Sequence, residues 1–341
     1  MNKDTFAVDP ERTRVDIRHA HPLAMEEGLP AKVPFLPHRL MTNDHHRLVI
    51  GTEGELLLLD SDLQATGQVV VPFPMRISHA ALQDNRLYAT WIDGELMKAR
   101  MGAIDLSKPL QNGVNRAVLR THQDGQHPLH PEGAIWSHVL DAEPLGLSVL
   151  NDDLVFVLWR RGIYGLTPDA RERWRRPEAA WSYPKARPRG TETIALHMET
   201  STFTITSRGG RVQRRSQDNG ETLEEFIAPG PEAPLEHHFR EGDHHLYVST
   251  NGGMHWVHDD TVLANVQSSG PVQSAIWDHQ WNGWRVAGWR EELLLSPQQV
   301  ARHPWEEIPV ALIPVKNGAL ILFNDGSWAN SAFEHSNHEE E

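Results

Sequence analysis

The stretch Leu246-Tyr-Val-Ser-Thr-Asn-Gly-Gly-Met254 joins a short apolar, β-branched run to a glycine turn. Val, Tyr and Thr favour strands, and an Asn-Gly pair favours a tight turn between two of them. The same order of apolar strand, polar residue, glycine and new strand is found at 48–55, 87–95, 154–163, 203–211 and 320–327. A seventh copy, at 284–292, has Glu291 where the others have glycine. The sequence therefore predicts seven hairpins of one kind.

The glycines of these copies stand at matching points of the pattern: Gly54, Gly94, Gly162, Gly210, Gly253 and Gly326. Glycine adopts positive φ without steric cost, whereas a residue with a Cβ atom does so at a penalty. We therefore expect each of these six glycines to turn its hairpin with a positive φ.

The spacing of the copies indicates the fold class. The strand before each turn begins near residues 47, 86, 153, 202, 245, 283 and 319. Intervals near 40 residues with about four short strands each are typical of propeller blades, in which each sheet is covered by its neighbours. The apolar runs are too short, and are broken too often by turn residues, for an α-helical solenoid. The sequence predicts an all-β, seven-bladed β-propeller, with residues 1–341 forming a single domain.

Three segments depart from the repeat. Residues 102–143 are rich in Pro and Gly and predict a long irregular insertion. The seventh repeat lacks a fourth strand, and the alternating segment Arg12–Arg18 is the predicted replacement, which would close the ring. The acidic tail 334–341 is predicted to be flexible.

The stretch Ser216-Gln-Asp-Asn-Gly-Glu-Thr-Leu223 resembles the Asp-box, the S-x-D-x-G-x-T-W hairpin of BNR and sialidase-like propellers, with Leu223 in place of the aromatic residue. A looser match covers Ser249–Trp256. The resemblance implies a turn between the third and fourth strands of a blade. Because the Asp and hydroxyl side chains of such a box bond their own hairpin, it marks a fold rather than a reaction. The blades are also similar to WD-type blades in their strand number.

The likeness to sialidases implies a glycosidase hypothesis. Such an enzyme would need three arginines for a carboxylate, a Tyr nucleophile with a Glu partner, and an Asp acid. The chain offers four tyrosines, and Met75-Arg-Ile-Ser78 is a partial match to the Arg-Ile-Pro element of that family. A sialidase-like glycosidase is therefore one alternative function.

Charge and composition bound the partners. The chain has 46 acidic and 32 basic residues, a net charge of −14 and no cysteine. An excess of negative charge opposes binding to nucleic acids and anionic membranes. No apolar run is long enough to span a bilayer, and charged residues interrupt the first 18 positions. We expect a cytoplasmic protein without membrane contacts.

The segment 160–215 reverses this balance, with thirteen basic and five acidic residues. This basic sector, in blades 3 and 4, predicts contact with an acidic protein surface, although the charges could instead be chance clusters on solvated strands. Aromatic residues between Arg171 and Lys185 keep nucleic acid open as a partner. Trp and Arg, the side chains enriched in binding hot spots, also stand beside the repeated turns. The predicted contact residues are Arg160, Arg161, Arg173, Arg175, Arg176, Arg187, Arg208, Trp91, Trp159 and Trp289.

Histidine supports a second enzymatic hypothesis, because the chain contains 21 of them. Four of these, His79, His197, His238 and His279, lie near the first strands of four blades. If these strands line a channel, the imidazoles could hold iron or another first-row transition metal. In blade number the chain is similar to the carotenoid oxygenases, which carry a four-histidine iron site. The alternative is that these histidines are solvated or locally hydrogen-bonded.

Together these features favour a non-catalytic β-propeller that serves as a protein-interaction platform or a subunit of a larger complex. The metal-dependent enzyme, the glycosidase and the nucleic-acid-binding subunit are the alternatives. The sequence predicts no cofactor for the favoured function, and it does not fix the oligomeric state.

Overall fold

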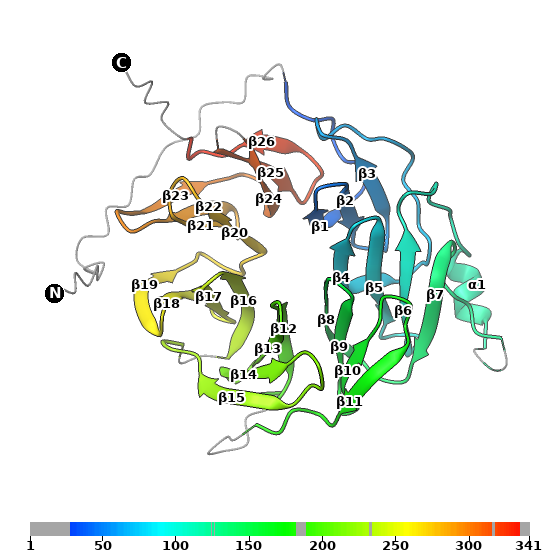
Figure 1. Cartoon of the computed structure of the whole chain (residues 1–341). Coiled ribbons are helices and arrows are strands. Elements are labelled where there is room, and N and C mark those ends of the chain that lie inside the picture. The colour runs from blue at the N-terminus through cyan, green and yellow to red at the C-terminus, as the bar shows by residue number, and fades with distance from the viewer. Residues whose placement is uncertain are drawn as a thin grey trace. The chain divides into compact units, whose positions relative to one another are not determined.

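The computed structural model describes residues 28–334 except 124, 126, 182–188, 232–233 and 316–317. The chain forms two compact units, one of residues 41–228 and one of residues 1–40 and 229–341. Seven antiparallel sheets follow one another along the sequence, and we number them sheets 1 to 7 in that order (Figure 1). In the described ranges, the one helix is short, and no helix is long and apolar enough to cross a membrane.

The unit of residues 41–228 carries sheets 2 to 4 and the last two strands of sheet 1, whose first strand begins before residue 41. Sheet 1 has three strands, β1 (Pro37–Thr42), β2 (Arg47–Gly51) and β3 (Leu56–Leu59). Sheet 2 has β4 (Arg76–Gln83), β5 (Arg86–Asp93), β6 (Lys98–Asp105) and β7 (Ala134–Leu140). Sheet 3 has β8 (Pro144–Leu150), β9 (Asp153–Leu158), β10 (Gly162–Leu166) and β11 (Glu172–Arg176). Sheet 4 has β12 (Thr193–Met198), β13 (Thr202–Ser207), β14 (Arg211–Ser216) and β15 (Thr222–Ile227).

The second unit carries the last three sheets. Sheet 5 has β16 (Leu235–Glu241), β17 (His244–Ser249), β18 (Gly253–His258) and β19 (Thr261–Gln267). Sheet 6 has β20 (Ser274–Asp278), β21 (Gly283–Gly288), β22 (Glu291–Leu295) and β23 (Val300–Pro304). Sheet 7 has three strands, β24 (Pro309–Val315), β25 (Gly318–Phe323) and β26 (Trp328–Asn330).

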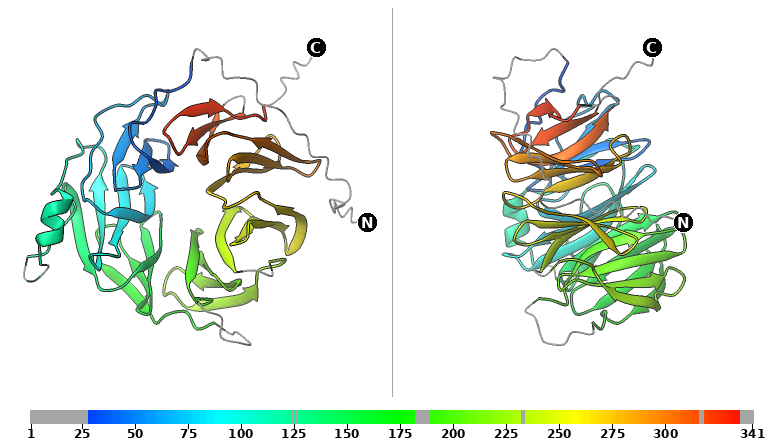
Figure 2. Two further views of the ribbon diagram at one scale, coloured as in Figure 1. Left: turned by 180° about the vertical axis from the view of Figure 1, so that it is seen from behind. Right: turned by 90° about the vertical axis from the view of Figure 1, so that its left-hand side faces the viewer.

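Within each unit the first strands of successive sheets adjoin: β8 packs against β4 and β12, and β20 packs against β16 and β24 (Figure 2). The repeat extends to a detail of the pairing. Sheets 2, 3, 4, 5 and 7 each have a register shift near the start of the first strand, where one residue is left unpaired by the second strand. A bulge bends its strand and increases its twist, so the five sheets share one local distortion at the same point.

The hydrophobic core fills the space between successive sheets of a unit. One cluster joins sheets 1 and 2 around Trp91, and another joins sheets 5 and 6 around Trp256 and Trp284. Trp91 is fully buried, and Trp256 is 1% exposed. Each fully buried large apolar side chain contributes about 2 kcal/mol to folding by leaving water. Because both faces of a sheet are covered in this way, the second strand of a sheet, such as β2 or β9, is a nearly continuous apolar run.

The predicted irregular insertion at 102–143 is only partly irregular. It holds the end of β6, a helix α1 (Arg116–Thr121) and the whole of β7, which completes sheet 2 as its outer strand. The sequence of β7 does not predict a half-buried strand, because Ile135 and Val139 place apolar residues on one face and Trp136 and Leu140 place them on the other, so apolar and polar residues do not alternate. In the structure Ile135 and Val139 are 44% and 47% exposed. Asn115 caps α1 by accepting a hydrogen bond from the Val118 amide.

The repeated turns are present between the second and third strands, but only four predicted glycines have positive φ: Gly54, Gly162, Gly210 and Gly326. In sheet 5 the positive φ belongs to Gly252 rather than Gly253, and in sheet 2 it belongs to Met97 rather than Gly94. In sheet 6, where Glu291 replaces glycine, Arg290 has a φ of 56°. A residue with positive φ therefore occurs at every one of these turns, although it is not always the predicted glycine.

The segment before β1 is attached to sheet 7. The Val33 amide donates to the Gly326 carbonyl at 2.9 Å, and Lys32 pairs with Asp325 at 2.7 Å. A Cβ atom on Gly326 would lie 2.2 Å from the Val33 carbonyl oxygen, so this approach requires glycine. The predicted closing strand at Arg12–Arg18 and the tail 335–341 lie outside the described residues, and ring closure by that strand stays a prediction.

Candidate functional site

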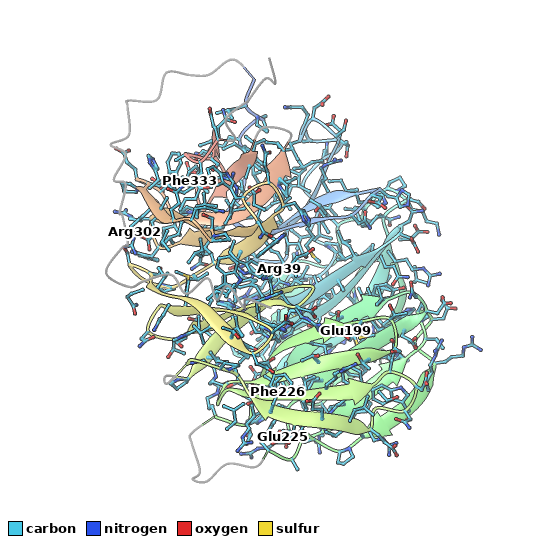
Figure 3. The ribbon with its side chains drawn as sticks, turned by 60° about the vertical axis from the view of Figure 1, so that its left-hand side comes forward. Arg39, Glu199, Glu225, Phe226, Arg302 and Phe333 are labelled. Atoms are coloured by element: carbon cyan, nitrogen blue, oxygen red, sulfur yellow. The ribbon has the colours of Figure 1, made fainter. Side chains whose placement is uncertain are left out.

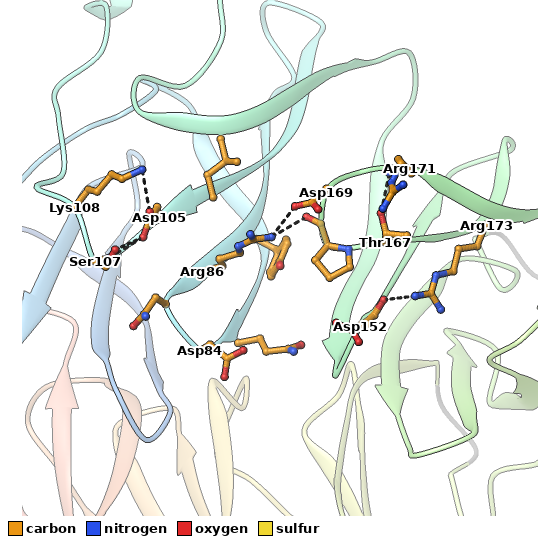
Figure 4. A pocket seen from close by; sticks show the side chains of 15 residues that line it. Asp84, Arg86, Asp105, Ser107, Lys108, Asp152, Thr167, Asp169, Arg171 and Arg173 are labelled. Atoms are coloured by element: carbon orange, nitrogen blue, oxygen red, sulfur yellow. Dashed lines mark hydrogen bonds and ion pairs between the residues drawn. The ribbon is translucent and has the colours of Figure 1, made fainter.

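A polar groove lies at the turn ends of sheets 2 and 3, both in the unit of residues 41–228. Its volume is about 730 Å³, and its lining comes from the β4–β5 turn, the end of β6, the β8–β9 turn and the β10–β11 turn (Figure 4). The charged side chains that line it are balanced in sign: Asp84, Asp105, Asp152, Asp169, Arg86, Lys108, Arg171 and Arg173. We call this cavity the charged groove.

The middle of the charged groove joins the two sheets. Arg86 Nη1 lies 3.0 Å from Asp169 Oδ1, and the Trp136 indole donates to the Pro168 carbonyl at 2.8 Å. Hydrogen bonds to Tyr88 and Asp169 raise the pKa of Arg86, while burial raises the pKa of Tyr88. These contacts hold the β10–β11 turn against β5 and β7 and give the groove a fixed floor.

The ends of the groove carry further pairs. Arg173 donates to Asp153 at 2.6 Å and to the Asp152 carbonyl at 3.0 Å. Lys108 lies 3.2 Å from Asp105. The pKa of the Asp105 carboxyl is lowered, first by hydrogen bonds from Ser107 and then by Lys108. Since these groups sit near solvent, the pairs can be exchanged for groups of a partner at small cost.

Beside the groove, three exposed arginines lie within or just before β11, the outer strand of sheet 3. Arg171, Arg173 and Arg175 alternate along the chain and are exposed, while Trp174 between them is partly buried. The pairing of β11 with β10 is irregular here, because Trp174 pairs with Gly165 and Glu172 with Leu166, which leaves Arg173 in a bulge. Arg175 also lies over the Tyr164 ring, 4.8 Å from its centroid. We call these three residues the arginine row.

The predicted basic sector is less positive in space than in sequence. Five of its predicted contact arginines have acidic partners, at 2.6 to 3.2 Å: Arg161 with Asp141, Arg173 with Asp153, Arg175 with Glu172, Arg176 with Glu221, and Arg208 with Glu192. Three of these acids lie outside the segment 160–215, because antiparallel pairing and neighbouring sheets bring them there. Arg160 lies over Trp159 at 5.4 Å, and Arg187 falls in 182–188, outside the described residues.

The tryptophans beside the turns divide into two groups. Trp91, Trp256 and Trp328 are core residues, 0%, 1% and 6% exposed, so the prediction that Trp91 contacts a partner is wrong. Its side chain points between the sheets, into the cluster with Phe73 and Met75. Trp159 is partly buried, and Trp289 is 44% exposed. The exposed Trp289 is thus the predicted contact tryptophan most accessible to a partner.

The four predicted metal ligands have other contacts. His79 Nε2 lies 3.0 Å from the Pro144 carbonyl, and His238 Nε2 lies 2.9 Å from His245 Nδ1. His197 lies on β12, as expected for a first strand, whereas His279 follows β20 and its side chain is 82% exposed. Over the described ranges, no three His, Asp or Glu side chains are grouped to hold a metal ion. The metal-dependent alternative stays a prediction.

The Asp-box-like stretch forms the turn between β14 and β15, the third and fourth strands of sheet 4. Its Asn219 side chain accepts from the Glu221 amide at 2.9 Å, and Asp218 is exposed. The looser match at 249–256 is an Asn-Gly turn between a second and a third strand. Burial raises the pKa of Tyr88 and Tyr247, which is opposite to what a tyrosine nucleophile needs.

Sequence reasoning missed the charged groove itself. Arg86 and Asp169 are 83 positions apart, and nothing local marks them as partners. The sequence does contain one signal for the groove. Turns at the same end of neighbouring sheets lie along a common edge, so charged residues in such turns predict a polar site there.

No protein-family model matches this sequence, and no curated protein does. Many solved structures are similar in fold, among them the following three. The β-propeller domain of Myceliophteria thermophila Cps50 (Swd1) has a TM-score of 0.63 at 8% identity, covering 89% of this chain and 98% of that one. The WD40 β-propeller domain of Doa1 gives 0.58 at 12% identity, covering 87% and 93%. BamB from Moraxella catarrhalis gives 0.53 at 12% identity, covering 87% and 96%. The seven sheets thus form a seven-bladed β-propeller, as the sequence predicts.

Proposed function

We propose that this chain is a non-catalytic protein-interaction platform in the cytoplasm, a subunit of a larger complex. Its charged groove and arginine row receive an acidic surface of a partner protein. The observation that carries the proposal is the arginine row, three exposed cations within five residues, two of which line a groove large enough for a protein segment.

The chemistry of the groove supports a polar protein ligand. Sites for small apolar molecules are lined mostly by hydrophobic side chains, whereas eight charged side chains line this one. Paired, exposed charges contribute more to specificity and association rate than to affinity. In the free protein, charges of the groove pair with one another near solvent, as in Lys108–Asp105, whose side chains are 75% and 21% exposed. Such pairs are easily exchanged for groups of a partner.

An apolar contact at the groove supplies a second element of recognition. Ile135 on β7 lines the groove and is 44% exposed. Interfaces commonly place an apolar anchor inside a polar rim, and Ile135 stands among charged neighbours in this way. We therefore expect Ile135 to be covered when the partner binds.

Site-specific photo-crosslinking tests this function. A benzophenone amino acid at position 135 should cross-link one protein in extracts of the source cell, and the linked peptide should be rich in Asp and Glu. The matched control is position 262, since Val262 is also an apolar residue of an outer strand, 38% exposed. Products that are equal at both positions, or that vanish after nuclease treatment, would contradict a groove that binds protein.

A further inference from the structure

A second cavity, separate from the charged groove, lies between the end of β11 and the β14–β15 turn. Its volume is about 310 Å³, within the range of small-ligand sites. Arg176 and Pro177 line one side, and Arg215 and Gly220 line the other. All of these residues belong to the unit of residues 41–228.

Arg215 is the unusual member of this cavity. It is only 6% exposed, and its hydrogen bonds go to neutral oxygens: Nε and Nη2 donate to Gln213 Oε1 at 3.0 and 2.6 Å, and Nη1 donates to the Gly220 carbonyl at 2.9 Å. A guanidinium has five N–H groups. One N–H on each of Nη1 and Nη2 therefore has no acceptor among the described residues.

Among the described residues, no carboxylate forms a hydrogen bond or an ion pair with Arg215, and the charge of Glu225 acts on it only at a distance, which raises its pKa. Glu225 accepts from Gln213 Nε2 at 2.8 Å and pairs with Arg211 at 3.6 Å. Glu225 and Phe226 are labelled on β15 in Figure 3. Burial, followed by the positive charge of Arg176, lowers the pKa of Arg215 to about 10. The free cavity thus holds a buried cation at an electrostatic cost.

Arg176 brings a second guanidinium to the cavity. Its Nε donates to the Asn219 carbonyl at 2.7 Å, and its Nη2 lies 3.2 Å from Glu221. Glu221 is 63% exposed at its side chain, so this pair can open toward solvent when a better anion arrives. Glu178 also lines the cavity, and its carboxylate disfavours highly charged anions.

The walls are held in place before any ligand binds. The Trp174 indole donates to the Gln217 carbonyl at 2.8 Å, which ties β11 to the hairpin of sheet 4. Gly220 has a φ of 71°, and a Cβ atom there would lie 2.5 Å from Trp174 and 3.0 Å from Arg176 Cγ. A rigid wall of this kind lowers the entropic cost of binding.

We propose that this cavity is a binding site for a small molecule that carries one carboxylate or phosphate group, with Arg215 and Arg176 as its anchors. The two open N–H groups of Arg215 bind the anionic oxygens, and Arg176 exchanges Glu221 for the same group. Pro177 and Ala180 contact the body of the ligand. The site does not depend on the charged groove binding a protein.

The experiment titrates the full chain with inorganic phosphate and, separately, with propionate at constant ionic strength. The readouts are the side-chain Nε–H resonance of Arg215 and the melting temperature. We expect saturable changes with at least one anion, an affinity about tenfold lower in Arg176→Gln, and no binding in Ala180→Trp, which fills the cavity. The matched control, Arg214→Gln, changes an exposed arginine next to Arg215 that does not line the cavity, and it should bind as wild type does.

The two anions separate the ligand classes. A response to phosphate alone assigns a phosphate site, and a response to propionate alone assigns a carboxylate site. A response to both supports a general oxyanion site. The proposal fails if neither anion shifts the Arg215 resonance of the wild type saturably, or if Ala180→Trp and Arg176→Gln respond as strongly as wild type, since the effect would then be surface screening.

Discussion

The indole of Trp174 occupies the space that a side chain at Gly220 would need. A Cβ atom at position 220 would lie 2.5 Å from the Trp174 ring, and Gly220 itself has a φ of 71°. Trp174 belongs to sheet 3 and Gly220 to sheet 4. The contact therefore ties the outer strand of one sheet to the outer hairpin of the next. It also positions Arg176 and Arg215, the two arginines of the second cavity.

Gly220→Ala should destabilise the protein by about 3 kcal/mol, because it adds overpacking against Trp174 to the strain of a positive φ. Gly210 is the matched control, with a φ of 85° and nothing within 4 Å of its Cβ position. Gly210→Ala should cost only about 1 kcal/mol, the strain alone. Urea unfolding of both variants measures the difference, and equal losses would mean that Trp174 does not limit position 220.

The buried ion network of sheet 6 makes a second prediction. Arg285 is fully buried, lies 3.4 Å from Glu292 Oε1, and donates to the Phe333 carbonyl at 2.6 Å. Figure 3 labels Phe333 at the end of this network. Burial raises the pKa of Glu292, and its hydrogen bonds and Arg285 oppose that change.

Arg285→Met should lower the free energy of unfolding by about 3–5 kcal/mol, because it leaves a buried carboxylate without its cation. Arg161→Met is the control, since the Arg161–Asp141 pair is exposed on both sides, at 53% and 67%. Its loss should be below about 1 kcal/mol. Chemical denaturation compares them, and a small loss for Arg285→Met would show that its ion pairs do not stabilise the fold.

Histidine 244 predicts a pH dependence of stability. Its ring stacks on His258 and on Trp277, with centroids 4.2 Å apart in each case. Burial, and then the neighbouring His258, lowers its pKa below the ordinary value of 6.5. The unfolded chain therefore takes up the proton first as pH falls, so this contribution to stability is lost as pH falls through about 6.5.

His244→Phe keeps an aromatic ring and removes the titration, so stability between neutral and mildly acidic pH should fall less steeply than in wild type. His279→Phe is the control, because the His279 side chain is 82% exposed, and its slope should equal that of wild type. The measurement is the free energy of unfolding of wild type and both variants at several pH values across that range. A slope that is unchanged by His244→Phe would contradict the assignment.

Ring closure by Arg12–Arg18 makes a further prediction. Sheet 7 has three strands in the described structure, so an added N-terminal strand would cover its free edge. Deleting residues 1–19 should then lower the melting temperature sharply while leaving Val33 and Gly326 in contact. An unchanged thermal transition would rule out closure by this segment.

The repeat could be read from sequence because each hairpin is local. The turn after Leu246–Ser249 and its six counterparts each need only a short apolar strand followed by a few turn residues, and these are adjacent in the sequence. What could not be read depends on neighbours distant in the chain. Its place beside a turn predicts that Trp91 lies at the surface, yet the adjacent sheet covers it. The Arg86–Asp169 pair likewise arises only when two sheets meet, and the neutralisation of Arg173 by Asp153 arises only when β9 and β11 come together in sheet 3.

The central claim, capture of an acidic protein by the arginine row, is tested most directly by reversing its charge. Arg171→Glu with Arg173→Glu alters the groove, and Lys32→Glu with Arg120→Glu makes the same charge change at exposed cations elsewhere, 62% and 58% exposed. After nuclease treatment, pull-downs over a series of salt concentrations should show partner capture by wild type and by the control, weakening as salt rises. The first variant should remain folded and lose capture at every salt concentration. Capture of the same proteins by the Arg171→Glu, Arg173→Glu variant at the same salt concentration would contradict the account.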